Sequence, residues 1–269
     1  MAKPSLFYLS MLRTGTLTDP GSAAGYPIAN IKDMKSYTVW KSNGVTSPIN
    51  IDIDNGGSTQ NADYIAFVNH NLFTNGATVE VRADTFTPPT TVRLAAFSPA
   101  EDTVTLRTLT APGALRYWRI VITDPAPPFA AAPSIGDLYL GMKTTLTEYM
   151  TPGFDPFFDG VEVAGSRSEG GHALGATTRG HTHRARLSFG AAGAARADYT
   201  ATLNAFIDNH ANKRQPFFFV LDTDDTDFDT PRFIRHTDGG HISRMAVGGS
   251  WQRLTLDMDV EEAYMEPVV

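Results

Sequence analysis

Short alternating strands separated by turn residues constrain the first half of the chain more than any other feature. In residues 49–54, an isoleucine at every second position alternates with Asn50, Asp52 and Asp54, the pattern of a strand with one buried and one solvated face. The apolar run 64–68 is short enough for a strand buried on both faces. Further strands are expected at residues 7–9, 77–82, 92–96, 104–109, 117–122 and 135–141. Because no amphipathic helix interrupts them, these strands predict an antiparallel sandwich.

A junction at residues 149–160 divides the chain. It contains two prolines and two glycines, which disfavour the interior of a strand. Its three phenylalanines are unusual for a free linker, so we expect it to pack against a neighbouring domain. The sequence therefore predicts a β-sandwich over 1–148, the junction over 149–160, and a second domain over 161–269.

The second domain is expected to be a β-sheet with one helix. Between residues 194 and 210, Tyr199, Leu203, Phe206 and Ile207 recur at three- and four-residue spacing, which predicts an amphipathic helix against a sheet. The short apolar run 216–221 predicts its central strand, beside the helix. Strands are also expected at 161–164 and 184–189, and a three-stranded meander over 232–235, 242–247 and 251–260. The fold class is therefore mainly β in both domains.

Composition excludes several classes of protein. The chain has 269 residues and a net charge of −7, with no Lys/Arg cluster interleaved with aromatics, so we expect no nucleic-acid binding. It has no cysteine, which excludes disulfides, thiolate metal sites and cysteine nucleophiles. No apolar stretch reaches the length of a membrane span, and no export signal is expected at the N-terminus.

Two clusters have the residue types of a metal site. The segment 222–229 carries five carboxylates, Asp222, Asp224, Asp225, Asp227 and Asp229, enough oxygen for Ca²⁺ but in the wrong register for an EF-hand. A solvated turn is the alternative and is the one we favour.

The second cluster is His181-x-His183, which places two imidazoles on one side of an extended chain, with His172 nearby. Symmetry about a threefold axis would supply further nitrogens. The alternative is a polar loop with incidental histidines, so we expect neither a bound metal nor any other cofactor.

No catalytic constellation is present in the sequence. The chain has no Gly-x-Ser-x-Gly elbow, no His-Glu-x-x-His helix and no phosphate-binding glycine loop ahead of a helix. We therefore expect a protein that is not an enzyme. Trp40 and Trp118 are candidates for stacking on a sugar, but both lie where the expected sandwich would bury them, so core packing is the better interpretation.

The first half resembles the discoidin-type, galactose-binding-like jelly rolls. In that family a loop-borne Asn and a Trp precede a strand that ends in Asp, and an Arg-aromatic-Arg strand precedes a short closing strand. The matching segments, in order, are residues 26–30, 40–42, 51–54, 62–65, 115–120 and 135–141. The resemblance covers most of residues 1–148 and implies a jelly roll whose loop ends bind a ligand.

The layout of the whole chain resembles the minor structural proteins of tailed-phage tail tips, whose tube-type domains are sandwiches flanked by a helix. This resemblance implies a homo-oligomeric ring, a trimer or hexamer, in the tail of a virion assembled in the host cytoplasm. Its partners would be other tail proteins, namely tube, hub and tape measure, and a host surface glycan. The alternative function is a free-standing carbohydrate-binding or adhesion protein.

If a ring forms, we expect the second domain to supply its contacts. Three arginines, Arg179, Arg184 and Arg186, lie in one stretch and would meet Asp224, Asp225 and Asp227 of the adjacent copy. A heterologous interface repeated by rotation pairs two different patches in this way and closes a ring. Such charge pairs contribute register and partner choice, while apolar burial supplies most of the affinity.

Overall fold

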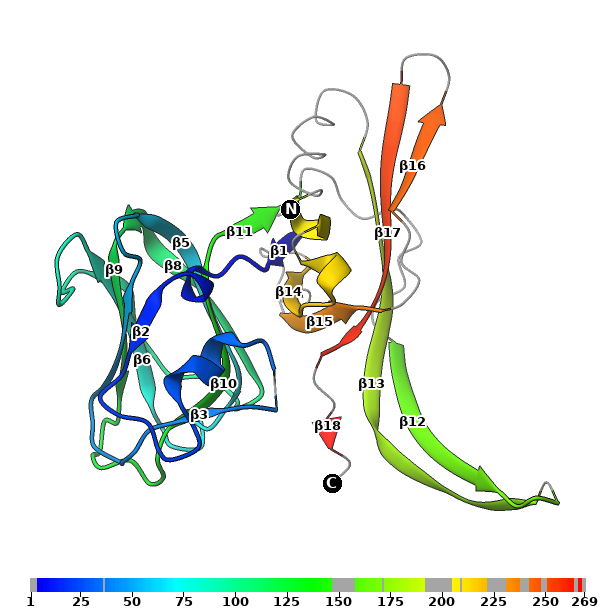
Figure 1. The fold of residues 1–269 in the computed structure, drawn as a ribbon, viewed down its shortest axis with the longest axis horizontal. Helices are drawn as coiled ribbons and strands as arrows, with labels where there is room; N and C mark the ends of the chain where they lie inside the picture. Colours follow the sequence, from blue (N-terminus) through cyan, green and yellow to red (C-terminus); the bar gives the residue numbers. More distant parts are fainter. Residues whose placement is uncertain are drawn as a thin grey trace. The chain divides into compact units, whose positions relative to one another are not determined.

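The computed structural model is mainly β and divides the chain into two compact units (Figure 1). It describes residues 4–35, 37–146, 158–170, 172–191, 205–208, 210–221, 231–237, 242–247, 251–263 and 266–267. One unit is Phe7–Lys143, and the other joins Met1–Leu6 to Thr144–Val269. The N-terminal strand β1 (Ser5–Phe7) lies in the sheet of the second unit, so the jelly roll is inserted after the first strand, whereas the sequence division placed this strand in the first domain.

The unit Phe7–Lys143 is an antiparallel sandwich, as expected. Its four-stranded sheet has the order β3-β10-β5-β8 and its five-stranded sheet the order β2-β4-β9-β6-β7. The strands are β2 (Thr16–Thr18), β3 (Trp40–Lys41), β4 (Ile49–Asp54), β5 (Gln60–His70), β6 (Thr78–Asp84), β7 (Val92–Phe97), β8 (Val104–Leu115), β9 (Tyr117–Thr123) and β10 (Ser134–Gly141). Two 3₁₀ turns, η1 (Met11–Arg13) and η2 (Ile28–Lys32), precede β3.

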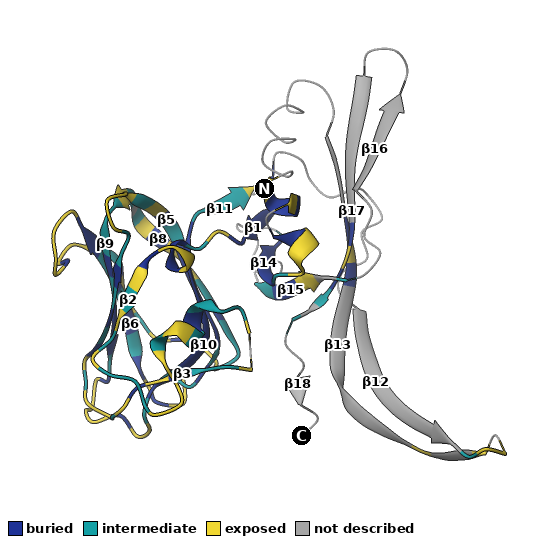
Figure 2. Ribbon diagram, in the orientation of Figure 1, coloured by how far each residue is buried: buried dark blue, intermediate teal, exposed yellow. Residues whose placement is uncertain are grey.

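The core of this unit follows the sequence pattern. In β4 the three isoleucines are buried and the polar residues between them are half-buried. The middle of β5 is buried on both faces. Figure 2 shows buried and exposed stretches alternating over the sandwich. Trp40 and Trp118 are fully buried, which confirms that both belong to the core. On the outer face of β4 and β9, Asp52 forms a two-pronged ion pair with Arg119 across the strands.

The second unit is built on one larger sheet with the order β11-β1-β14-β15-β17-β13-β12. Outside this order, β16 pairs with β17 and β18 pairs with β13. The strands are β11 (Lys143–Thr145), β12 (Phe158–Arg167), β13 (Ala173–Ala191), β14 (Phe217–Val220), β15 (Arg232–His236), β16 (Ile242–Val247), β17 (Trp251–Glu262) and β18 (Glu266–Pro267). A third 3₁₀ turn is η3 (Ala211–Lys213).

The expected strand at 216–221 is present as β14 and lies inside the sheet, although β15 and not β14 is the middle strand of its order. All four residues of β14 are buried, and the ring of Phe217 meets the ring of Phe206 edge-on at 4.9 Å. Phe206 lies in the helical residues 205–208, so this described part of the predicted helix packs beside β14. The remainder of the predicted helix, 194–204 and 209, lies outside the described residues, as does 149–157 of the junction; Phe158 to Gly160 begin β12.

One expected topology is wrong. The last three strands do not form a meander, because β15 and β16 both pair with β17, at residues 260–262 and 251–256 respectively. Both pairings are set by the length of β17, which is 12 residues and therefore long enough to hold two short strands end to end along one edge. Strand alternation alone does not reveal which neighbour a strand pairs with.

Candidate functional site

Four loops gather at one end of the jelly roll, where β4, β6, β8 and β10 begin. They are residues 42–48, 71–77, 98–103 and 124–133, and we call them the loop end. Phe129 N donates to the carbonyl of Val45 at 3.0 Å, which joins the first loop to the last. The backbone N–H of Asp124 donates to Ser47 Oγ at 2.9 Å and joins them again.

Two asparagines fasten the loop 71–77 to the loop 124–133. The Asn71 side chain donates to the carbonyl of Ala132 at 3.0 Å and accepts from Ser134 N at 2.8 Å. Asn75 Oδ1 accepts from Ala131 N at 2.9 Å. Side-chain bonds to the backbone therefore fix both loops, a role that short amides fill well in turns.

Phe73 is presented to solvent on a fixed backbone. Its side chain is 53% exposed, although a phenylalanine is ordinarily buried. The Asp102 carboxylate accepts from the backbone N–H of Phe73 at 2.8 Å and from both the N–H and the hydroxyl of Thr74. The Phe73 carbonyl in turn accepts from Gly76 N at 2.8 Å. The loop is therefore ordered by its own bonds before any ligand arrives.

His70 supports this loop from below. The imidazole is buried, its Nδ1 accepts from Leu72 N at 3.2 Å, and Nε2 therefore carries the hydrogen and donates to Thr105 Oγ1 at 3.2 Å. Burial lowers the pKa of His70 to about 4, against a smaller opposing effect of the Asp102 charge 3.6 Å away. The ring is thus neutral at pH 7 and positions the loop.

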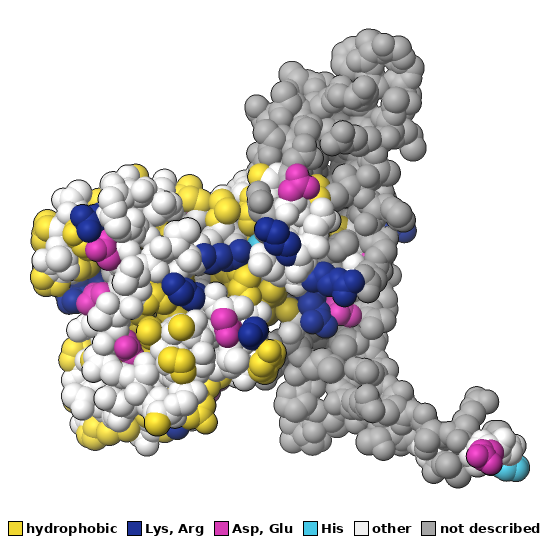
Figure 3. Space-filling model, in the orientation of Figure 1, with side chains coloured by type: hydrophobic (Ala, Val, Ile, Leu, Met, Phe, Trp, Pro, Cys, Tyr) yellow, Lys and Arg dark blue, Asp and Glu magenta, His cyan; other side chains and the backbone are white. Residues whose placement is uncertain are grey.

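The loop end has little charge. Its four loops contain no lysine or arginine, and their only ionisable residues are Glu101, Asp102 and Asp124. The Asp102 carboxylate accepts hydrogen bonds from Phe73 and Thr74. The Asp124 carboxylate accepts from Ala126 N at 2.7 Å. In Figure 3, hydrophobic and uncharged side chains cover most of the jelly-roll surface in this view. An uncharged ligand that offers an apolar face therefore suits the exposed ring of Phe73.

A buried carboxyl lies elsewhere in the same unit. Asp137 of β10 is 1% exposed and lines a small crevice together with Ser10, Arg13, Lys32 and Met34. Burial raises the pKa of Asp137 to about 7, and the Asp33 charge raises it further, while the Met34 backbone N–H and Arg13 oppose the rise. The crevice is too narrow to admit an organic ligand, so the loop end is the better candidate site.

Most of the predicted site residues lie in the second unit. Asp222, Asp224, Asp225, Asp227 and Asp229 lie outside the described residues, so the metal and interface predictions for them stay predictions. His181 and His183 are in β13, opposite Val161 and Asp159 of β12. Within the described part of the chain, no group of three His, Asp or Glu side chains is placed to hold a metal ion.

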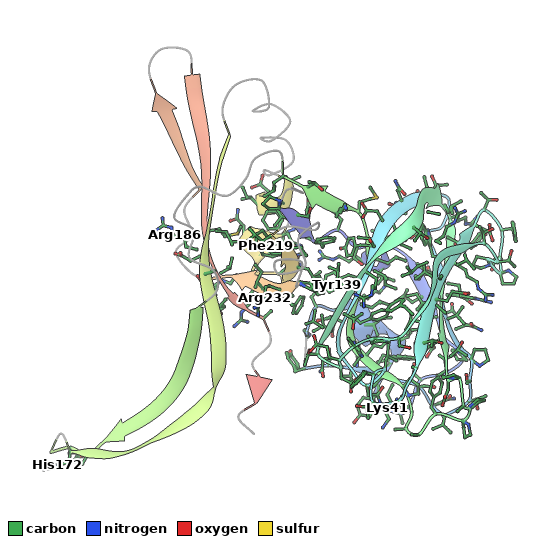
Figure 4. All side chains as sticks on the ribbon, turned by 180° about the vertical axis from the view of Figure 1, so that it is seen from behind. Lys41, Tyr139, His172, Arg186, Phe219 and Arg232 are labelled. Atoms are coloured by element: carbon green, nitrogen blue, oxygen red, sulfur yellow. The ribbon has the colours of Figure 1, made fainter. Side chains whose placement is uncertain are left out.

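The predicted interface arginines all lie in β13. Arg184 pairs with Phe158 on one side and Glu261 on the other, and Arg186, opposite Asp259, is exposed. Figure 4 shows Arg186 on β13 and His172 at the tip of the β12–β13 hairpin, where it is exposed. Whether these arginines meet a neighbouring copy stays a prediction.

Sequence reasoning missed the loop end. Phe73 and Asp102 are 29 positions apart, and neither belongs to a recognisable motif. The one available signal was the Asn-rich segment around 69–75, because asparagines that cap turns indicate an ordered loop.

No protein-family model and no curated protein matches this chain. Among solved structures it is similar to chitosan-binding module 1 of a chitosanase/glucanase from Paenibacillus sp. IK-5, at 17% identity over 50% of this chain and 100% of that one, with a TM-score of 0.42. It is also similar to the family 32 CBM of NanJ from C. perfringens in complex with galactose, at 15% identity over 52% of this chain and 99% of that one, with a TM-score of 0.39.

Both of these solved proteins are carbohydrate-binding modules. The tail-tip resemblance has no support among these neighbours. In the described parts of the chain, no helix has the length and apolar character needed to cross a membrane.

Proposed function

We propose that the protein is a carbohydrate-binding protein whose loop end holds an uncharged sugar against Phe73. The observation that carries this proposal is an exposed aromatic ring on a backbone already fixed by Asp102. A rigid ring loses little conformational entropy on binding, and its flat face suits the apolar face of a pyranose. The absence of Lys and Arg from the loops disfavours an acidic sugar.

A glycan array followed by titration calorimetry on the full chain tests the proposal. Neutral glycans should bind, and Phe73→Ala should weaken binding by about tenfold, the loss of one aromatic contact. Phe86→Ala is the matched control, because Phe86 is 54% exposed on a loop held by another carboxylate, Asp84, at the opposite end of the sandwich. Binding that responds equally to both substitutions, or no binding to any neutral glycan, would overturn the proposal.

A second candidate function is the structural, oligomeric component of a phage-like tail tip. The observation that favours it is the β12–β13 hairpin of the second unit, whose β13 runs for 19 residues while its neighbours pair with only part of it. A strand that extends beyond its paired neighbours has backbone groups that can pair with another chain. A native mass measurement should give a trimer or hexamer, and a monomer at every concentration reached would remove this candidate.

A further inference from the structure

Among the described strands, the sheet of the second unit ends at β11 and β12, and β16 pairs with β17 alone. Its order ends at β12 (Phe158–Arg167), which pairs with β13 on one side and with no described strand on the other. On the other flank, β16 (Ile242–Val247) pairs with β17 alone among the strands that the structure describes. The unpaired N–H and C=O groups of such edges are templates for a further strand.

Two β-bulges occur in the β12–β13 pair, and both lie in β13 rather than in β12. Between Glu162 and Val163 the register of β13 advances by two residues, from Gly180 to Thr178, so the extra residue is in β13. Between Ser166 and Arg167 it again advances by two, from Gly175 to Ala173. Bulges disrupt an edge and protect it from pairing. Both lie in β13, so β12 keeps ten residues in regular succession.

β12 also lacks two of the residues that often protect an edge. It contains neither lysine nor proline, the two residues most often placed on exposed edges. Moreover, residues 173–179 of β13 pair with β12 alone, so this part of the hairpin is two-stranded among the described residues and curves away from the rest of its sheet (Figure 1). A two-stranded ribbon is only marginally stable in water, and a third strand would stabilise it.

We propose that the outer edge of β12 binds β16 of a second copy of this chain, by addition of one strand to the other. A second copy is the fitting occupant because the same sheet offers an open edge on each flank, and two different edges joined in this way repeat by rotation. The charges agree: β12 carries Asp159, Glu162 and Arg167, net −1, and β16 carries Arg244, net +1. This inference rests on the assembly role named second above and is independent of sugar binding.

Hydrogen exchange measured by mass spectrometry, together with native mass, tests the proposal on the full chain. On going from dilute to assembled protein, the amides of 158–167 and 242–247 should slow by at least about tenfold, because paired amides are protected. Assembly that leaves both segments exchanging at the dilute rate would overturn the edge pairing while keeping the assembly role. A chain that stays monomeric would overturn both.

Disulfide trapping gives a second, more local readout, because the chain has no cysteine of its own. Chains carrying Val161→Cys or Val163→Cys are each mixed with chains carrying Met245→Cys and oxidised, and mixed disulfides are identified by mass. One of these β12 variants should form the mixed disulfide in at least about tenfold excess over Thr177→Cys, which lies on the bulged β13. Equal yields from both strands would contradict the proposal.

Discussion

Replacing Asp137 by Asn should leave the stability of the jelly-roll unit unchanged at about pH 4 and should stabilise it increasingly as the pH rises to about 7, with the full effect above that pH. The carboxyl is 1% exposed, and burial together with the Asp33 charge raises its pKa to about 7. Its pKa in the unfolded chain is about 3.9. Below pH 4 the Asp137 carboxyl is protonated in both the folded and the unfolded chain, so its burial in the folded protein costs no electrostatic free energy. As pH rises through 7, the folded protein must hold a buried charge.

The size of the effect follows from the difference between these two pKa values. Each pKa unit corresponds to about 1.4 kcal/mol, so a rise of about three units destabilises the fold by about 4 kcal/mol at pH 8 relative to a group that does not titrate. An amide of nearly the same shape does not titrate. Asp137→Asn should therefore raise the free energy of unfolding by up to about 4 kcal/mol at pH 8 and by almost nothing at pH 4.

Urea unfolding followed by tryptophan fluorescence at pH 4, 6 and 8 measures this difference, because Trp40 and Trp118 are both buried in the same unit. The exposed Glu101→Gln serves as the control for removal of one negative charge and should change stability little at any of these pH values. A difference between Asp137→Asn and wild type that does not vary with pH would refute the reasoning, as would a destabilised variant at pH 8.

Three further predictions concern the same unit and use the same unfolding assay. Gly141→Ala should destabilise it by about 2 kcal/mol or more, since the added Cβ would overlap a backbone carbonyl, whereas Gly57→Ala meets no atom and should be near neutral. In the Asp137→Asn background, the free energy of unfolding should fall by about 3 kcal/mol as the pH drops from 6.5 to 4. The reason is that the pKa of His70 is about 4 in the folded protein but 6.5 in the unfolded chain, so only the unfolded chain takes up a proton over this interval. A stability that does not change with pH would contradict this. Trp40→Phe should cost about 1–3 kcal/mol, because it removes the indole N–H that donates to a loop carboxylate at 2.8 Å, and an unchanged midpoint would show that this bond contributes nothing.

The strands and core of the jelly roll were predictable from local sequence. Alternation in residues 49–54 and the apolar run at 64–68 each fix which side chains are buried, because side chains in a strand alternate between its two faces. The same reasoning placed Trp40 and Trp118 in the core. Pairing is a different matter: β15 and β16 share one edge of β17, and their own sequences contain nothing that selects this arrangement over a meander.

The loop end was not predictable, because its order depends on bonds between distant residues. Asp102 accepts from Phe73 and Thr74, and Asn71 bonds a loop some 60 positions away. Each of these residues, taken alone, is a common turn residue with no distinctive spacing. The insertion of the jelly roll after β1 was not predictable either, because a strand of three residues is too short to show which sheet it joins.

Two of the buried titratable groups, Asp137 and His70, act on stability in opposite directions as the pH falls. Between pH 7 and pH 4, protonation of Asp137 favours the folded unit by about the amount that protonation of His70 in the unfolded chain disfavours it. The contributions of these two groups to the stability of the wild-type unit therefore largely offset each other over this interval. Because burial holds the pKa of His70 at about 4, its Nδ1 should keep accepting from Leu72 N above that pH, which preserves this bond in the loop that carries Phe73.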